Sequence, residues 1–371
     1  MLKANGMKAG RVYYVGLDVH LRTSTCCILD DQGQQVKLHT IRGHWSRTID
    51  FLQTLPGRLI IGFEASCAYG TVHDRLAAFC QRVVVAHPGH LRLIFASKRK
   101  NDRVDAAKLA KLLYLDELPA IHVPPPEVRA WRELIELRRW QIHQVTRVKN
   151  ALRALMRTYG IQTPDDMAVL WTKQGRAWLE TMDWPMPGAK LRCDVLLAQW
   201  DHFNQQIQRL TAQLDARAET HAGVALLCTI PGVGPRTAEA VIAYVDDPHR
   251  FHRINQVCAY AGLVPAENSS ADAQRFGHIT KTGPATLRWL LVEAAWQVIR
   301  REPSMRRYFE QIRGQDRHAG KKAIVAVARK LLRCMLAMLR SGEAWKPQTA
   351  SDEAAKGKKQ GVTLEACGAS R

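Results

Sequence analysis

The first 125 residues alternate between strand-like and helix-like patterns, and this order limits the fold more than any other feature of the sequence. Runs rich in β-branched and aromatic residues come first, at residues 12–18, 23–29 and 35–40. The polar sequence DDQG at residues 30–33 separates the second run from the third, and its glycine suits a turn position with a positive φ. Three antiparallel strands are the expected result.

Two helix patterns then alternate with two further strand patterns. The helices are expected at residues 45–53 and 71–80, and the strands at residues 59–63 and 83–85. Such β-α-β units add parallel strands to the earlier hairpins and place helices on the faces of the sheet. We therefore predict an α/β fold with a mixed sheet for residues 1–125.

The pattern changes after three consecutive prolines at 124–126. Apolar residues then recur every three or four positions in two series, 128–159 and 196–214, which predicts two long amphipathic helices packed as an antiparallel pair or a coiled coil. Further helices are expected at residues 236–245, 285–300 and 320–339. The predicted parts are the α/β domain, a helical coiled-coil or linker domain, a mainly α domain and a disordered polar tail, at residues 1–125, 126–221, 222–344 and 345–371.

Basic residues outnumber acidic ones, and the net charge is +20 over 371 residues. Such an excess favours a polyanionic partner, either nucleic acid or an anionic membrane surface. The membrane is the weaker alternative, because no run of about 18 apolar residues is present. Residues 1–11 lack the apolar core of a signal peptide, and the nine cysteines form no CxxC pair. We expect a cytoplasmic, nucleoid-associated protein without a membrane partner.

Four carboxylates in the first 125 residues end strand patterns or open a helix pattern. Asp18 ends the first strand and Glu64 follows the fourth, while Asp102 and Asp105 are spaced i, i+3, which places both on one face of a helical turn. Carboxylates that converge in this way can hold two Mg²⁺ ions, with Mn²⁺ as an alternative, for phosphoryl transfer. Each acid alone has a plainer interpretation as a turn former, or as an N-cap in the case of Asp102.

Two segments are candidates for nucleic-acid contacts. Gly232 and Gly234 flank one valine between two helix patterns, which resembles a helix-hairpin-helix motif whose backbone N–H groups contact phosphates; a plain tight turn is the alternative. The first long helix is densely basic, and its residues Arg139, Lys149 and Arg153 either contact nucleic acid or form a solvated face.

A third group joins the loop serines Ser269 and Ser270 to the cations Lys281 and Arg288. A serine can attack a phosphodiester when neighbouring cations stabilise the charge on the phosphoryl group. On composition alone, an ordinary loop serine is the simpler interpretation.

Together these motifs resemble one family, the DEDD-motif transposases of insertion sequences, which are related to the Piv-type pilin-gene invertases and are described as bridge-RNA-guided recombinases. The resemblance covers about residues 12–340. It depends on the segments GLDVH, GFEAS, NDRVDA, IPGVG and GLVP…SS…GHITKTG, at residues 16–20, 62–66, 101–106, 230–234 and 262–283.

The resemblance implies a RuvC-like N-terminal domain with the ribonuclease H fold. Its metal-binding acids would be the four carboxylates already identified, Asp18, Glu64, Asp102 and Asp105. The partners that it implies are donor and target DNA, an element-encoded structured noncoding RNA that pairs with both, and further copies of the chain that form dimers and then a tetramer through the coiled coil.

The resemblance also implies a serine nucleophile in the C-terminal domain, which would form a covalent phosphoserine intermediate with DNA. Ser270 aligns best with this serine and Ser269 is the alternative. Ala271 stands where relatives usually have glycine, which costs backbone freedom if the position needs a positive φ.

Two other functions stay open at this point. One is a RuvC-like nuclease that resolves DNA junctions by metal-activated water, with no covalent step. The other is a nucleic-acid-binding scaffold with an inactive nuclease fold, against which the presence of all four acids argues.

Overall fold

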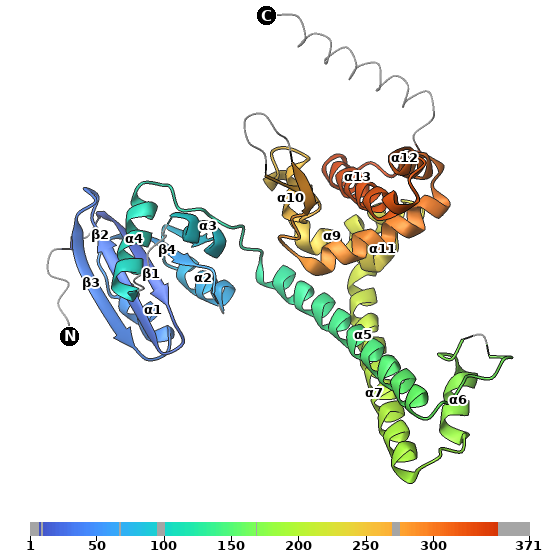
Figure 1. The fold of residues 1–371 in the computed structure, drawn as a ribbon. Helices are drawn as coiled ribbons and strands as arrows, with labels where there is room; N and C mark the ends of the chain where they lie inside the picture. The colour runs from blue at the N-terminus through green and yellow to red at the C-terminus, as the bar shows by residue number, and fades with distance from the viewer. Residues whose placement is uncertain are drawn as a thin grey trace, which may run out of the picture. The chain divides into compact units, whose positions relative to one another are not determined.

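The computed structural model describes residues 7–8, 10–66, 68–94, 101–167, 169–268 and 275–347. The chain divides into two compact units, Met1–Pro126 and Glu127–Arg371 (Figure 1).

The N-terminal unit is built on a five-stranded sheet with the strand order β3-β2-β1-β4-β5. The strands are β1 Val12–Val19, β2 Thr23–Leu29, β3 Gln35–Arg42, β4 Arg58–Glu64 and β5 Arg82–Ala86. β2 lies antiparallel to β1 and β3, whereas β4 lies parallel to β1 and β5. The predicted mixed sheet, a meander followed by β-α-β units, is confirmed.

Helices cover both faces of this sheet. They are α1 Ser46–Gln53, α2 Tyr69–Ala77, α3 Pro88–Ile94 and α4 Asp102–Tyr114. Successive strand residues point to opposite faces, so Val15 and Leu17 of β1 pack with Leu52 of α1 and Leu76 of α2 in one apolar cluster. On the opposite face α4 lies across β1 and β2, with its Ala106 in the buried cluster that joins them (Figure 1).

The backbone of α4 touches β1 at Gly16. A Cβ atom at this position would lie 2.2 Å from both the carbonyl oxygen of Ala106 and the amide nitrogen of Ala110. Glycine on the strand and alanines on the helix let the two backbones approach more closely than larger residues allow. The position of α4 over the sheet therefore depends on this small-residue contact.

The C-terminal unit contains two apolar cores. The first is formed by α5 Pro126–Thr158, α6 Lys173–Thr181 and α7 Pro187–Glu219. Leu152 of α5, Leu179 of α6 and Trp200 of α7 are buried in it. The two long helices lie where the sequence predicts them; their arrangement as a coiled coil stays a prediction.

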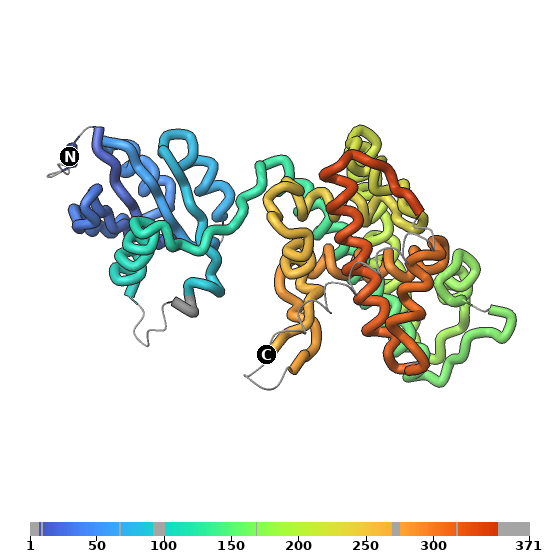
Figure 2. The backbone as a smooth tube through the Cα atoms, turned by 90° about the horizontal axis from the view of Figure 1, so that it is seen from above, coloured from blue at the N-terminus to red at the C-terminus, as the bar shows by residue number. Residues whose placement is uncertain are grey.

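The second core surrounds α13 Gly320–Ser341. The other elements of this part are α8 Ala222–Cys228, α9 Pro235–Val245, η1 Pro248–Arg250, α10 Gln256–Tyr260, α11 Ala285–Arg301, α12 Pro303–Arg313 and η2 Arg317–Ala319. Figure 2 shows α11, α12 and α13 side by side, and each of these helices packs against the other two. A short hairpin, β6 Pro265–Glu267 with β7 Phe276–Ile279, lies where the sequence pattern predicts a loop.

The predicted disordered tail does not begin at Trp345. Its backbone N–H donates a hydrogen bond to Oγ1 of Thr229 at 3.0 Å, and its indole N–H donates one to Oε2 of Glu302 at 3.1 Å. The ring also packs against the second core. An aromatic side chain with a satisfied N–H anchors the chain here despite its polar surroundings. The remainder of the predicted tail, residues 348–371, lies outside the described residues.

We expect Gly16→Ala to destabilise the N-terminal unit by about 2 kcal/mol or more, because the new methyl group must displace the α4 backbone from the sheet. The free energy of unfolding from denaturant titration measures this. Gly188→Ala is the matched control, since a Cβ at Gly188 meets no atom within 4 Å. Equal stability of both variants would show that α4 is free to shift.

Candidate metal centre and nucleic-acid contacts

The first turn of α4 presents two carboxylates because another residue caps the helix. Asn101 is the N-cap, and its side-chain oxygen accepts a hydrogen bond of 3.0 Å from the backbone N–H of Arg103. Asp102 and Asp105 follow in the first turn. The interpretation of Asp102 as only an N-cap is therefore wrong: its carboxylate is not needed to satisfy the helix terminus.

Asp18 and Glu64 lie at the carboxyl ends of the adjacent parallel strands β1 and β4. Leu17 of β1 is paired with Phe63 of β4. The residues that follow them, Asp18 and Glu64, therefore lie at the same height along the two strands. Both acids follow a glycine by two positions, Gly16 and Gly62, and both glycines face α4 or the residues after it. The alternation of a strand therefore turns both acids toward the face that α4 covers.

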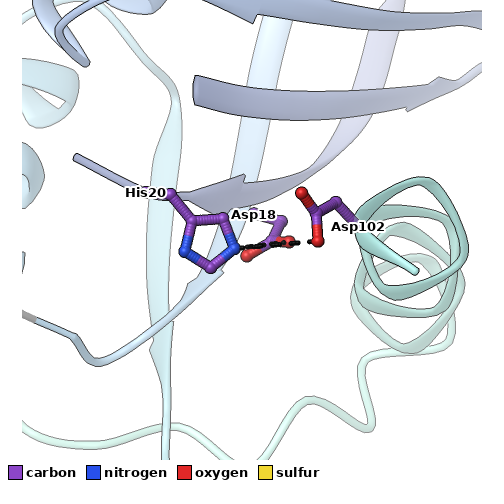
Figure 3. A group of neighbouring side chains, drawn as sticks. All are labelled: Asp18, His20 and Asp102. Carbon is purple, nitrogen blue, oxygen red and sulfur yellow. Dashed lines mark ion pairs between the residues drawn. The ribbon is translucent and has the colours of Figure 1, made fainter. Parts of the chain in front are cut away.

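His20 completes a close group with two of these acids (Figure 3). Its Nε2 lies 3.2 Å from Oδ2 of Asp18 and 3.9 Å from Oδ1 of Asp102. One donor atom from each of the three residues lies within 4.8 Å of the others. The sequence interpretation did not assign His20 a role, although the spacing Asp-x-His across a strand end places both side chains on one face.

Burial and negative charge together make this group electrostatically strained. The Asp18 side chain is only 16% exposed, and burial, with the carboxylates of Asp102 and Asp105, raises its pKa, while His20 opposes this shift. Oδ2 of Asp18 is buried and accepts no well-formed hydrogen bond from the described residues. Buried oxygens without donors are costly unless another group satisfies them.

These donors fit a divalent cation. Carboxylate oxygens suit Mg²⁺ and Mn²⁺, and an imidazole nitrogen favours Mn²⁺ and other transition metals over Mg²⁺. Asp18 and Asp102 contribute to the close group directly, and Asp105 acts on Asp18 through its charge. Glu64 is exposed at the same end of the sheet but is not part of the three-residue group.

The basic residues predicted on α5 contact aromatic side chains. The guanidinium of Arg139 donates a hydrogen bond to Oγ1 of Thr286 at 2.6 Å and lies 5.6 Å from the ring of Trp289. Lys149 and Arg153 lie over the ring of Trp171, at 5.2 and 4.9 Å. Arg139 thus bridges α5 and α11 within the fold, and its contact with nucleic acid stays a prediction.

The glycine turn and the nearby cations are also integrated into the fold. Gly232 has φ +96°, and a Cβ there would lie 2.8 Å from the backbone of Gln297 in α11, so this glycine serves a close helix contact. Gly234 is exposed at the start of α9, with space around it.

Arg288 donates hydrogen bonds to the carbonyl oxygens of Ala261 and Thr282, whereas Lys281 is exposed with φ +55°. The helix-hairpin-helix motif stays a prediction.

The predicted nucleophile, Ser270, and its alternative, Ser269, lie outside the described residues. In sequence they stand between β6 and β7. The last described residue before them and the first after them are paired: the N–H of Asn268 donates a hydrogen bond of 2.9 Å to the carbonyl of Arg275.

Two family models match the chain. Residues 15–161 match a transposase family named for a DEDD motif and IS110, and residues 224–310 match the transposase IS116/IS110/IS902 family. Together the matches cover more than half of the chain. In the described part of the chain, no helix is long and apolar enough to cross a membrane.

Curated proteins show the same relationship. A probable family 20 transposase of Pseudomonas aeruginosa is 27% identical over 67% of this chain and 74% of its own length. The putative transposase y4qE of Sinorhizobium fredii is 28% identical over 53% of this chain and 47% of its own. The pilin gene-inverting protein of Moraxella lacunata is 30% identical over 39% of this chain and 43% of its own.

The chain thus spans about half the length of the Sinorhizobium and Moraxella relatives and three quarters of the Pseudomonas protein. The N-terminal match contains Asp18, Glu64, Asp102 and Asp105, and the C-terminal match contains the glycine turn and the β6–β7 hairpin. The chain belongs to the IS110/IS116/IS902 family of insertion-sequence transposases.

Proposed function

We propose that this protein cuts and rejoins DNA strands at the ends of an insertion sequence by metal-assisted transesterification. The observation that carries the proposal is the convergence of Asp18, Asp102 and His20 at the carboxyl end of β1. Asp105 of α4 acts on Asp18 through its charge, and Glu64 lies at the same end of the sheet on β4. A divalent cation bound there would polarise a scissile phosphate and stabilise charge on the attacking and leaving oxygens.

The residues of the chain have distinct roles in this proposal. Asp18 is the central ligand, because it is the most buried of the three and its Oδ2 has no well-formed hydrogen bond among the described residues. Asp102 is half-exposed on the first turn of α4 and leaves the site open to a DNA strand. His20, 3.2 Å away, opposes the rise in the pKa of Asp18 that burial and the neighbouring carboxylates cause.

For the joining chemistry we propose a covalent step through Ser270, with Ser269 as the alternative. Attack of the serine oxygen on a phosphodiester forms a phosphoserine bond and breaks one phosphorus–oxygen bond of the DNA. The leaving deoxyribose oxygen takes up a proton, and the serine proton is lost to a base or solvent. A hydroxyl of the partner strand reverses these events at the phosphoserine, which joins the strands and restores the serine.

Sequence choice in the proposed reaction is delegated to an element-encoded RNA that pairs with donor and target DNA. The protein then reads duplex shape and backbone rather than base edges. Lys281 and Arg153 are the exposed cations of the predicted contact set, and Gly234 is exposed as well, so these three positions are available to phosphates. Assembly into dimers and a tetramer would supply both DNA partners with a site.

Asp18→Asn should abolish strand exchange, remove metal binding and raise the stability of the metal-free protein. Burial and neighbouring acids raise the Asp18 pKa in the folded state. Its contribution to stability is therefore most favourable at low pH and falls as pH rises through that raised value. Removing the charge should raise the Tm by roughly 2–4 °C at neutral pH.

The measurement is thermal unfolding with and without Mn²⁺ or Mg²⁺, together with a DNA cleavage assay. Wild type and Asp50→Asn, a control at an exposed acid of α1, should gain stability from the cation. Asp18→Asn should gain none. A variant that still binds cation and recombines DNA would contradict the metal site.

The covalent step is tested with a suicide DNA substrate that traps the protein–DNA adduct. Adducts should form with wild type and Ser269→Ala and be absent with Ser270→Ala. Loss only in Ser269→Ala would move the nucleophile by one residue. Metal-dependent cleavage without an adduct in any protein would instead support a nuclease that uses activated water.

A further inference from the structure

A pocket of about 340 Å³ opens beside the C-terminal end of α5. Figure 1 shows the chain turning there from α5 toward α6. Its walls come from the last turns of α5 and from the segment between α5 and α6. The lining side chains are Arg153, Met156, Arg157, Ile161, Met167 and Leu170, with Thr163 at its edge. The volume lies in the range of small-ligand sites.

The pocket combines an apolar floor with a cationic rim. Met156, Met167 and Leu170 are buried, whereas Arg153 and Arg157 are exposed. In the part of the chain that the structure describes, neither guanidinium forms an ion pair with a carboxylate. The rim therefore carries two positive charges that the fold itself does not neutralise.

Aromatic rings hold the cations near this rim. The guanidinium carbon of Arg153 lies 4.9 Å from the ring centre of Trp171, and Nζ of Lys149 lies 5.2 and 5.3 Å from the rings of Trp171 and Trp200. Burial and the charge of Arg153 lower the pKa of Lys149. Positive charge is thus concentrated beside the pocket, and cation–π contacts rather than acids stabilise it.

We propose that this pocket receives one unpaired nucleotide of the nucleic acid that the protein binds, with the base on the apolar floor and the phosphate at Arg153 and Arg157. The inference rests on the proposed function only in taking nucleic acid as the partner. Unstacked bases bind against apolar and guanidinium surfaces, and arginines bind phosphate oxygens in a bidentate way. An apolar ligand alone would leave both arginines without an anionic partner.

The charges of the neighbourhood support this occupant. Asp165 and Asp166 are on the same segment but do not line the pocket. The net charge of +20 draws polyanions to the protein as a whole. An extruded nucleotide is the part of a nucleic acid that brings an apolar face and a negative charge together at this size.

The test is ultraviolet crosslinking of the full-length protein to single strands of 12 nucleotides that carry one central 5-iodouracil, as DNA in one arm and RNA in the other. Crosslinked peptides are mapped by mass spectrometry. We expect the wild type to crosslink within residues 153–171. Thr163→Trp, which fills the pocket from its exposed edge, should reduce this crosslink about tenfold.

Arg157→Gln should lower the salt dependence of binding by about 0.7 in the slope of log K against log salt. Arg147→Gln is the matched control, because Arg147 is an exposed arginine of the same helix that does not line the pocket. Circular dichroism and thermal unfolding confirm that each variant is folded.

The outcomes separate the two proposals. Binding with crosslinks only outside residues 153–171, or a crosslink there that Thr163→Trp leaves unchanged, overturns the pocket and leaves the proposed function standing. A protein that neither binds nor cleaves nucleic acid overturns both. A crosslink confined to the RNA arm or to the DNA arm supports the pocket and identifies which strand supplies the nucleotide.

Discussion

The backbone contact between β1 and α4 at Gly16 is the constraint on which the N-terminal unit depends. A Cβ there would lie 2.2 Å from backbone atoms of α4. The helix can lie this close to the strand only because residue 16 has no side chain. Asp18 follows two residues later on the same face, and Asp102 opens the same helix. Close packing of helix on strand thus brings both carboxylates near the same imidazole nitrogen, Nε2 of His20.

This arrangement places a destabilising group on a well-packed support. The face of the sheet opposite α4 is a continuous apolar cluster that includes Val15, Leu17, Ile61 and Phe63, all at most 1% exposed. That cluster offsets the cost of a buried carboxylate with a raised pKa and an unsatisfied oxygen. A site that binds cations gains from this strain, because ligand geometry and charge are fixed before the ion arrives.

Sequence patterns predicted the sheet of the N-terminal unit well, because its strands are bounded by turns and differ clearly in period from the helices. The strand-end and helix-start positions of Asp18 and Asp102 were also readable. The role of His20 could not be predicted, since a histidine after a strand becomes a candidate ligand only when α4 brings a second carboxylate near it.

The β6–β7 hairpin was missed because its short strands are largely exposed and lack a clear alternation. The internal position of Arg139 depends on Trp289 and Thr286, about 150 residues away in the chain.

The arginines of the C-terminal unit show why net charge is a poor count of nucleic-acid contacts. Arg132, Arg250, Arg288 and Arg340 donate hydrogen bonds to backbone carbonyls and so fix loops and helix ends. A carbonyl does not neutralise a guanidinium, so these side chains still contribute to the long-range field that attracts a polyanion. Their donors, however, are already directed inward. Short-range contacts with nucleic acid are then made by exposed cations that do not bind other groups of the fold. Arg157, at the rim of the pocket beside the C-terminal end of α5, is such a cation among the described residues. The field brings the nucleic acid to the protein, while a few such side chains determine where it is held.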